Sequence, residues 1–488
     1  MNFLNFRNDY LALGEAFYHK NAPTPVARPA LFLWNDTLAD ELGIPRSAKD
    51  NPERLAALFS GNEVMAGAEP VSLAYAGHQF GQFNPQLGDG RAHLLGAVED
   101  QSHRLREIQL KGSGRSAFSR SGDGRCALGP AIREYVMSEA MAALGIATTR
   151  CLAVVTTGEP VYREEVLPGA VVTRIAASHI RVGTFEYFYS RGDLDALASL
   201  LDYTIKRHYP EIDSKDSPER YLALLEKVME RQIELVVAWM RVGFIHGVMN
   251  TDNTSIAGET IDYGPCAMMS QYHPGTVFSS IDIQGRYAFG NQPTIAQWNV
   301  ARFAECLIPF VGDDEQQAVE RLGPLINQFS DKFEQAFMTM MAGKLGLATL
   351  EKNDYSLVLD LLAIMKQQGM DYTLTFDRLT EGVVCEDYWQ PLRQPLHEWL
   401  PTWQQLLAQQ PHDKQSVQQS MRRQNPVVVP RNHHMEAVLE ACVKNLDPTP
   451  AFEFLRVLQS PYQEIAGTEQ FKDAPQDNDR SYQTFCGT

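Results

Sequence analysis

Two different hydrophobic patterns follow one another along the chain. From about residue 71 to residue 175, short apolar runs rich in β-branched residues alternate with glycine-containing turns, which predicts the strands of an antiparallel sheet. The runs are HLLGAV at 93–98, LREIQL at 105–110, CLAVVTT at 151–157 and GAVVTRIA at 169–176. One helix interrupts this sheet at 130–145, because Pro130 stands in its first turn and Gly145 marks its end.

Helical periodicity takes over after about residue 190. The segment 221–244 places apolar residues at helical spacing and leads directly to His246. Residues 311 to about 465 are also predicted to be helical, with a Gln- and Pro-rich middle that is typical of a mobile connection. Residues 1–70 mix short helical patterns with Pro-containing turns, and we interpret them as scaffold.

This order of elements is the order found in a protein kinase, with a β-rich small lobe, one helix and then a helical large lobe. We therefore predict an α+β, protein-kinase-like bilobal fold with N-terminal and C-terminal helical extensions. The predicted units are an N-terminal extension at 1–70, a small lobe at 71–185, a large lobe at 186–310, a helical region at 311–465 and a flexible tail at 466–488.

The segment HGVMNTDN matches the spacing of a kinase catalytic loop, H-R-D-L-x-x-x-N, but lacks its base. His246 and Asn253 keep the separation of seven residues, whereas Val248 occupies the position of the catalytic Asp. Asp262 opens a D-Y-G sequence where kinases have D-F-G. Asn253 and Asp262 offer the oxygen ligands that Mg²⁺ or Mn²⁺ prefers, so we predict a metal site, with Asp252 as the base and His246 orienting the loop. The alternative is an Asx-rich surface turn.

Lys111 and Glu134 fit the ion pair that positions nucleotide phosphates in a kinase small lobe. Lys111 closes the alternating strand LREIQLK, and Glu134 lies in the first turns of the helix that follows. A lysine at a strand end is ordinarily a solvated edge residue. The catalytic interpretation therefore depends on the other kinase-like elements that occur in the same order.

The tetrapeptide GDGR occurs twice, at 88–91 and 122–125, on either side of Lys111. Glycine lets backbone N–H groups approach phosphate oxygens in positive-φ turns, and Arg91 and Arg125 add positive charge. Neither copy fits a Walker loop. One copy alone would be interpreted as a hairpin turn, but two copies that flank a strand lysine favour a nucleotide site.

Arg174 and Arg181 lie near the predicted junction of the two lobes. Strand-end arginines are normally surface residues. In a chain this acidic, however, two arginines close to a predicted phosphate site are expected to hold the terminal phosphates, because guanidinium matches phosphate in a bidentate geometry.

The charge narrows the range of partners. The chain has 60 acidic against 43 basic residues, a formal charge of −17, so its field repels nucleic acids and anionic membranes. It contains no long uninterrupted apolar window, and its N-terminus lacks the apolar core of a signal peptide. We therefore expect a cytoplasmic protein with neither a nucleic-acid nor a membrane partner.

The seven cysteines are scattered singly along the chain, which argues against a structural zinc site or a disulfide framework. Cys486 lies third from the end in a polar segment, where burial as a small hydrophobe is not expected. It is a candidate redox thiol, and the alternative is an inert exposed cysteine.

Several long motifs together resemble the selenoprotein O family, known in bacteria as YdiU. They are YAGHQFG, LGDGR, LKGSGRSAFSRSGDGR, IREYVMSEAMAALGI, SHIRVGTFEYF, HGVMNTDN, IDYGP and RRQNPVVVPRN, and the similarity extends over nearly the whole chain. The family consists of pseudokinase-fold protein adenylyltransferases. The resemblance therefore implies that ATP binds in an orientation flipped relative to kinases, and that AMP is transferred to a Ser, Thr or Tyr hydroxyl of a protein, including the enzyme itself.

The resemblance also implies roles for individual residues. The implied nucleotide contacts are Gly88, Gly90, Arg91, Lys111, Asp123, Gly124, Arg174, Arg181 and Asp262. Asn253 and Asp262 are the implied metal ligands and Asp252 the implied proton acceptor. The resemblance leaves open whether the nucleotide is ATP or UTP and whether the metal is Mg²⁺ or Mn²⁺. Redox proteins are implied as targets.

A redox switch is implied as well, since eukaryotic family members carry a selenocysteine near the C-terminus, and in the family this group can pair with a cysteine in the loop beyond the D-Y-G element. Cys486 stands at the matching location, and the nearest partner is Cys266. The match is incomplete, because the segment PGTVFSSIDIQGRY further on has no cysteine. Two other functions remain open: an ordinary protein kinase with Asp252 as a relocated base, and an inactive nucleotide-binding scaffold.

Overall fold

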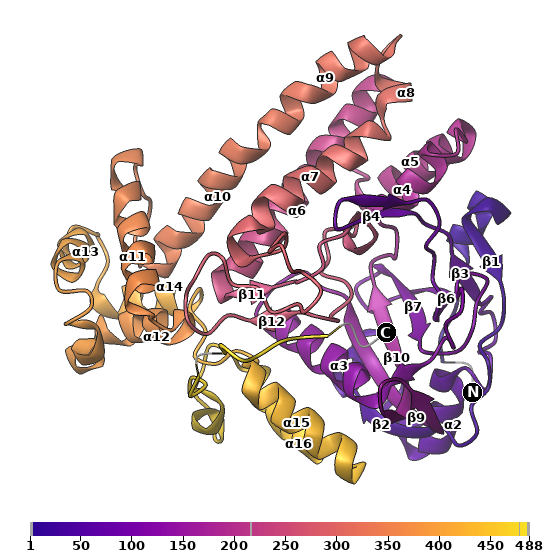
Figure 1. Ribbon diagram of the computed structural model, residues 1–488, viewed down its shortest axis with the longest axis horizontal. Helices are drawn as coiled ribbons and strands as arrows, with labels where there is room; N and C mark the ends of the chain where they lie inside the picture. The colour runs from indigo at the N-terminus through magenta and orange to yellow at the C-terminus, as the bar shows by residue number, and fades with distance from the viewer. Residues whose placement is uncertain (1–2, 215–216, 478, 486–488) are drawn as a thin grey trace.

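An antiparallel sheet of eight strands occupies one end of the protein in a computed structural model that describes residues 3–214, 217–477 and 479–485 (Figure 1). The strand order is β1-β3-β6-β7-β10-β9-β2, and β8 pairs with β10 beside this path. The bounds are β1 Tyr18–Lys20, β2 Ala30–Trp34, β3 Val71–Leu73, β6 Ala92–Glu99, β7 Leu105–Lys111, β8 Cys126–Ala127, β9 Arg150–Tyr162 and β10 Val166–Ala176. The four strands predicted from the apolar runs are confirmed as β6, β7, β9 and β10, and all of their pairings are antiparallel.

The first 70 residues contribute more to the sheet than their sequence suggested. They form β1 and β2, the two edge strands, together with helices α1 (Asp36–Glu41) and α2 (Pro52–Ser60). Asn51 caps α2 by accepting a hydrogen bond from a backbone N–H of its first turn, and Pro52 begins the helix, as is common at this position. The segment that we interpreted as scaffold therefore supplies two strands of the sheet.

Both faces of the sheet are covered. Side chains on successive residues of a strand point to opposite faces, so Val154 of β9 packs in the core on the side of α3 (Leu128–Ala143), whereas Val155 packs in the core that contains α2. The predicted interrupting helix is confirmed as α3, and Gly145 follows it with a φ of +76°. The sheet is therefore a rigid base for side chains at its edge.

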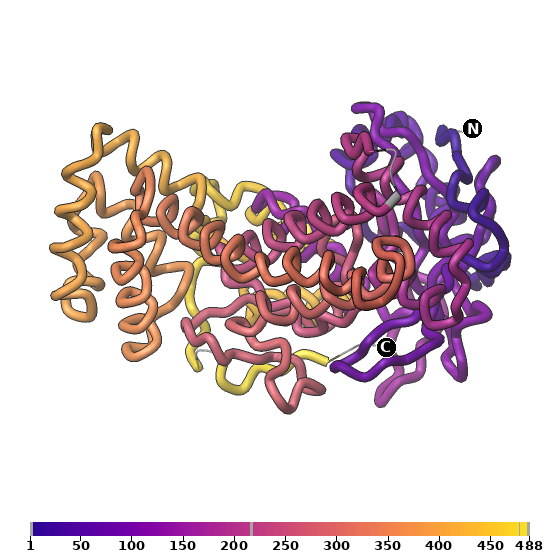
Figure 2. The backbone as a smooth tube through the Cα atoms, turned by 90° about the horizontal axis from the view of Figure 1, so that it is seen from above, coloured from indigo at the N-terminus to yellow at the C-terminus, as the bar shows by residue number. Residues whose placement is uncertain are grey.

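Helices make up most of the remaining chain. Their bounds are α4 Val182–Tyr189, α5 Leu194–His208, α6 Ser217–Val242, α7 Gln292–Glu305, α8 Ile308–Val311, α9 Glu315–Asn327, α10 Phe329–Lys344, α11 Tyr355–Gln368, α12 Tyr372–Gly382, α13 Trp399–Ala408, α14 Lys414–Arg422, α15 Asn432–Asn445 and α16 Thr449–Leu458. Figure 2 shows the orange helices α11 to α14 at the end of the molecule opposite the indigo and purple sheet. None of the helices formed by the described residues is long and apolar enough to cross a bilayer.

The chain between α6 and α7 forms the loop that faces the sheet. It contains the short paired strands β11 (Phe244–Ile245) and β12 (Ala267–Met268) and the 3₁₀ turn Thr251–Asn253. A hairpin of β4 (Gly77–Gln79) and β5 (Gln82–Asn84) lies against this turn. The C-terminal helices α15 and α16 return to pack on α3, so the last part of the chain lies near the same loop.

Candidate active site

A cavity of about 560 Å³ lies between the sheet and the loop after α6. It brings together the residues that the sequence assigned to nucleotide, metal and base from segments far apart in the chain. These residues are Gly88, Gly90, Arg91, Lys111, Asp123, Gly124, Arg174, Arg181, Asp252, Asn253 and Asp262. Glu134 lines an adjoining cavity of about 870 Å³, whereas His246 is buried behind the loop.

Four charged side chains form a network of ion pairs on the sheet side of the cavity, three of them buried and the fourth, Asp262, partly exposed. Lys111, the last residue of β7, donates hydrogen bonds to Glu134 on α3 (2.8 Å) and to Asp262 of the loop (2.6 Å). Arg174 on β10 donates to the same Asp262 oxygen over 2.9 Å and also to Glu134. The register of the sheet produces this meeting, because Gln109 of β7 lies directly opposite Arg174 and Lys111 follows two residues later on the same face.

The two carboxylates of this network are held ionised. Burial by itself would raise the pKa of Asp262, but Lys111 and Arg174 outweigh it and hold that pKa well below its usual range. The pKa of Glu134 is likewise lowered against the effect of burial, by Arg174 and then by Lys111. The predicted Lys111–Glu134 pair is therefore present as an ion pair within a larger group of two cations and two anions.

Both GDGR copies line the 560 Å³ cavity. Gly88 and Gly124 have φ angles of +82° and +71°, a backbone conformation that glycine adopts without strain. Asp89 of the first copy is buried and accepts a hydrogen bond from Gln109 (3.0 Å), which fixes this loop to β7. Asp123 of the second copy pairs with Arg163 over 2.8 Å, and this hydrogen bond lowers the pKa of Asp123. The two loops are thus anchored through their aspartates.

Arg181 lines the cavity and has one side-chain donor without a hydrogen-bond partner among the described residues. It lies at the N-terminus of α4, and its guanidinium stacks on the ring of Tyr75 at 4.2 Å from the centroid. Its Nη2 is 3.7 Å from Asp89, and its Nε is buried without a hydrogen-bond partner among the described residues. Arg174, by contrast, is engaged by Glu134 and Asp262, so Arg181 is the cation better able to accept a new anionic partner.

His246 connects two segments of the loop after α6, the one that contains Val248 and the one that contains Ile261. Its Nε2 is 3.0 Å from the carbonyl of Ile261, and its Nδ1 accepts a hydrogen bond from the backbone N–H of Val248 (3.3 Å). Burial lowers the pKa of His246, so the ring is neutral, as these two hydrogen bonds require. Its role in orienting the loop stays a prediction. Val248 is buried and offers only its backbone.

Asp252 is the least satisfied carboxylate of the cleft. One of its oxygens accepts a hydrogen bond from Gln79 of β4 over 3.1 Å, whereas Oδ1 is buried without a hydrogen-bond partner among the described residues. Burial raises the pKa of Asp252 to about 6. A buried polar atom without a partner is uncommon in proteins and indicates a functional group or an absent ligand.

The loop also presents oxygen donors suited to a divalent cation. Asn253 donates its amide N–H to the carbonyl of Val248 (3.2 Å), and both Asn253 and Asp262 line the 560 Å³ cavity. Asp262 has a φ of +68°, an uncommon conformation for a residue other than glycine, and it is held ionised. An ionised carboxylate and an amide oxygen are hard ligands of the type that Mg²⁺ and Mn²⁺ bind, so the residues present fit such an ion.

Of the two cysteines of the predicted redox pair, Cys486 lies outside the described residues. Cys266 is buried, and burial raises the pKa of its thiol to about 12. The C-terminal segment does pass close by, since the Thr484 hydroxyl donates to the carbonyl of Pro265 over 2.7 Å.

Several residues of the cleft were missed by the sequence reasoning. Tyr75, Gln79, Asp89 and Arg163 all line the 560 Å³ cavity. The first three lie within or beside the motifs YAGHQFG and LGDGR, so the motifs contained a signal although no role was assigned to these positions. Arg163 lies in the turn between β9 and β10, where no local pattern marks it.

Comparisons with known proteins match nearly the whole chain to members of one family. A family model described as "Protein adenylyltransferase SelO" matches residues 1–459. Three similar proteins carry the name "Protein nucleotidyltransferase YdiU", and each is 52% identical to this chain. The relatives from Teredinibacter turnerae and Pseudoalteromonas translucida align over 99% of this chain and their own full length, and the relative from Rhodopseudomonas palustris strain HaA2 over 99% of both chains.

Proposed function

Since the chain belongs to the SelO family of protein adenylyltransferases, we propose that the 560 Å³ cavity binds ATP and is the site from which AMP is transferred to Ser, Thr or Tyr hydroxyls of proteins, the enzyme itself included. The observation that carries this proposal is the convergence of Lys111, Arg181, Asp252 and Asp262 in one cleft, with the Oδ1 of Asp252 unpartnered.

The architecture supports a kinase-like division of the chain into a small lobe and a large lobe. In this proposal the strands from β3 to β10 and α3 form the small lobe at 71–185, and α6 and the loop after it belong to the large lobe at 186–310. The segments at 1–70 and 311–465 extend these lobes, and 466–488 is the tail. The ion pair from strand to helix and the Asn253–Asp262 spacing are the features of a kinase site that support this division.

We assign phosphate binding to the cations of the cleft. Glu134 and Asp262 hold Lys111 and Arg174 in place, and Arg181 adds a side-chain donor that has no hydrogen-bond partner among the described residues. The backbone of the GDGR loops, with Gly88, Gly90 and Gly124, contributes N–H groups and close approach, and Arg91, Asp123 and Arg181 complete the nucleotide contacts. Fixed charges aimed at the reacting phosphate stabilise a transition state without reorganisation.

Asn253 and Asp262 would hold the divalent cation. When bound, Mg²⁺ or Mn²⁺ neutralises charge on the phosphate oxygens. The protein contributes the placement of both ligands, which the hydrogen bonds of the loop through His246 and Val248 keep together. Since Mg²⁺ and Mn²⁺ both accept carboxylate and amide oxygens, the proposal includes either ion, and it includes UTP as a second nucleotide.

Asp252 is assigned as the proton acceptor for the incoming hydroxyl. Its Oδ1 has no hydrogen-bond partner among the described residues, so a substrate hydroxyl that reaches it donates without displacing an existing hydrogen bond. Gln79 holds the other oxygen and fixes the plane of the carboxylate. The α-phosphorus is the electrophile, the hydroxyl oxygen forms the new P–O bond, and pyrophosphate leaves as the proton passes to Asp252.

The substrates are proteins, and we propose redox proteins among them because the resemblance implies them. We also propose that oxidation joins Cys486 to Cys266 and alters activity. Peptide mapping under non-reducing conditions after mild oxidation tests the pairing. Recovery of both thiols in the free form would rule it out.

The proposed transfer is tested with radiolabelled ATP. Purified protein and a cell lysate are incubated with Mg²⁺ and either α-³²P-ATP or γ-³²P-ATP, and label on protein is measured. We expect label from the α position only. The Asp262→Ala variant should lose it, whereas Asp360→Asn, which changes an exposed carboxylate on α11, should keep it.

Each other outcome identifies a different function. Label from the γ position only would mean that the protein is a kinase in which Asp252 serves as the base. If neither position labels protein while ATP still binds to the purified chain, the protein is a nucleotide-binding scaffold and the proposal fails.

A further inference from the structure

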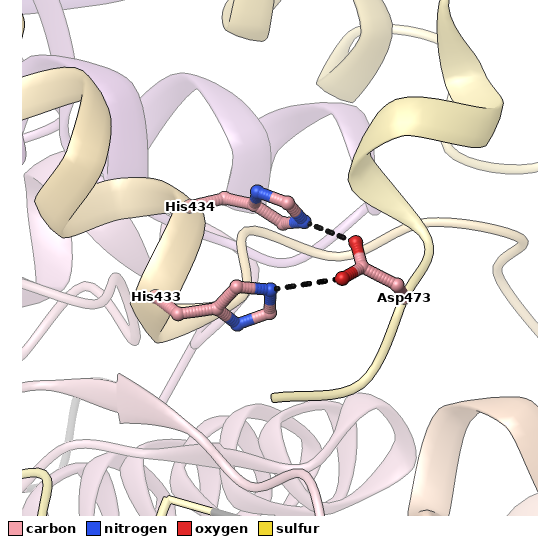
Figure 3. A group of neighbouring side chains, drawn as sticks. All are labelled: His433, His434 and Asp473. Atoms are coloured by element: carbon pink, nitrogen blue, oxygen red, sulfur yellow. Dashed lines mark hydrogen bonds and ion pairs between the residues drawn. The ribbon is translucent and has the colours of Figure 1, made fainter. Parts of the chain in front are cut away.

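A second group of possible metal ligands lies outside the cleft, where α15 meets the C-terminal segment (Figure 3). His433 and His434 are in the first turn of α15, and Asp473 follows the 3₁₀ turn Thr468–Phe471. One ligand atom from each of the three lies within 4.8 Å of the other two. This is the one group of three or more His, Cys, Asp or Glu side chains among the described residues that meets this condition.

The carboxylate of Asp473 reaches both imidazoles, but it satisfies only one of them. Its Oδ1 is 2.7 Å from the Nε2 of His434, a hydrogen-bond distance, and its Oδ2 is 3.7 Å from the Nε2 of His433, which is too far. The two rings lie side by side with their centroids 4.0 Å apart. Figure 3 shows both rings pointing toward the carboxylate.

His433 has no hydrogen-bond partner for either ring nitrogen among the described residues, although both nitrogens are buried. A neutral imidazole carries one N–H donor and one acceptor, so both are left unsatisfied. Buried polar atoms in proteins are nearly always paired, and an unpaired group indicates an ion or a water molecule that completes the site. This observation is independent of the clustering of the three side chains.

We propose that His433, His434 and Asp473 bind a transition-metal ion, with Zn²⁺ as the expected occupant. Two imidazoles and one carboxylate are ligands that suit Zn²⁺, whereas Mg²⁺ prefers sites made of oxygen alone. Ligand atoms around a tetrahedral zinc ion lie about 3.3–3.5 Å apart, so side-chain shifts of about an ångström would close the group on the ion. The scattered cysteines argued against a structural zinc site, but this site uses no cysteine.

A metal ion at this site would connect two parts of the chain that lie beside the nucleotide cleft. Asp473 precedes the segment whose residues Pro475, Asp477 and Tyr482 line the 870 Å³ cavity, and His433 lines the same cavity from α15. That cavity shares Lys111 and Asp262 with the nucleotide cleft. A bound ion would therefore fasten the C-terminal segment to α15 beside the active site.

The test uses the full-length protein, stripped of metal with a chelator and titrated with Zn²⁺ in excess Mg²⁺, which occupies oxygen-ligand sites. We expect one Zn²⁺ per chain by calorimetry. His434→Gln, His433→Gln and Asp473→Asn should each weaken binding by at least about tenfold. His397→Gln, which changes an exposed histidine, should bind as the unmodified protein does. Asp473 is largely exposed, so Asp473→Asn keeps the test valid if a histidine variant does not fold.

Hydrogen exchange provides a second readout that does not depend on activity. Zn²⁺ should slow amide exchange in residues 472–477 of the unmodified protein and leave it unchanged in Asp473→Asn. Equal affinity of the unmodified protein and Asp473→Asn would overturn the proposal, as would the absence of zinc binding in excess Mg²⁺. Zinc binding that Asp262→Ala abolishes and Asp473→Asn retains would place the ion in the nucleotide cleft and would also overturn it.

Discussion

The two sides of the cleft differ in how completely their charges are paired. On the sheet side, Lys111, Glu134, Arg174 and Asp262 form a closed set of ion pairs, in which Asp262 is partly exposed and the other three side chains are buried. On the loop side, Asp252 is buried but has one oxygen without a hydrogen-bond partner among the described residues. The first arrangement is complete before any ligand binds. The second leaves one carboxylate oxygen without a hydrogen bond among the described residues, and we propose that the substrate hydroxyl supplies the missing partner.

The difference indicates which charged residues of the site contribute to the stability of the fold and which are suited to the reaction. A buried charge is tolerated when it is paired, and breaking such a pair is strongly destabilising. A buried and unpaired carboxylate costs stability but is ready to accept a proton. We therefore expect substitutions on the sheet side to affect folding as well as activity, and a substitution of Asp252 to affect activity alone.

The largest effect is expected from Asp262→Ala, which removes the residue that joins the two sides. The variant loses the proposed metal ligand and the anion shared by Lys111 and Arg174, so AMP incorporation should fall by at least about 10⁴-fold. Single-turnover labelling with α-³²P-ATP measures the loss. Activity within tenfold of the unmodified protein would show that Asp262 is not a ligand of the reacting nucleotide.

Asp252→Asn should reduce the single-turnover rate by about 10²–10⁴-fold, the usual contribution of a positioned base. The amide is isosteric and still accepts the hydrogen bond from Gln79, so the Kd for ATP should stay within about threefold. Stability to urea should not fall, because the substitution removes a buried charge that lacks a full set of partners. An unchanged rate would exclude Asp252 as the base.

Glu134→Gln tests the sheet side. It leaves Lys111 and Arg174 with one carboxylate between them, and we expect the free energy of unfolding to fall by about 3–5 kcal/mol. Urea denaturation of the nucleotide-free protein measures this loss, with Asp252→Asn as the matched carboxylate-to-amide control. If both variants lose the same stability, the contrast between the two sides is wrong.

Glu259 extends the comparison to a carboxylate outside the cleft. Burial, partly offset by a hydrogen bond from the backbone N–H of Ala177 (2.9 Å) and by Arg106, raises its pKa to about 7 from its ordinary value of 4.5. Below about pH 4.5 Glu259 is protonated in both the folded and the unfolded chain, so its ionisation does not change the free energy of unfolding. As the pH rises toward 7 the unfolded chain releases its proton first, and stability is lost.

Glu259→Gln removes this dependence and retains an acceptor for Ala177. We expect the variant to match the unmodified protein near pH 4.5 and to exceed its free energy of unfolding by about 1–3 kcal/mol above pH 7. Urea denaturation at a series of pH values measures the difference. A difference that is constant with pH would mean that Glu259 is ionised normally in the folded protein.

Local pattern was enough to predict the central elements. Strands β6, β7, β9 and β10 and helices α3 and α6 carry hydrophobic periodicity over enough residues to be recognised without their partners. Lys111, Glu134 and Asp262 were found because their spacing from strand, helix and loop follows a known order. The edge strands β1 and β2 were missed, because they are short and exist only through ladder hydrogen bonds to distant residues.

The sequence by itself determined the class of the central elements, part of the lining of the cleft and the family to which the chain belongs, because each is encoded in contiguous or regularly spaced positions. Only the tertiary structure decided which of these residues are paired. It placed Gln79 against Asp252, Arg163 against Asp123 and the His433–His434 pair against Asp473. Such contacts join segments whose separation along the chain carries no local pattern, so they are set by how the sheet, the loop and the C-terminal helices pack together.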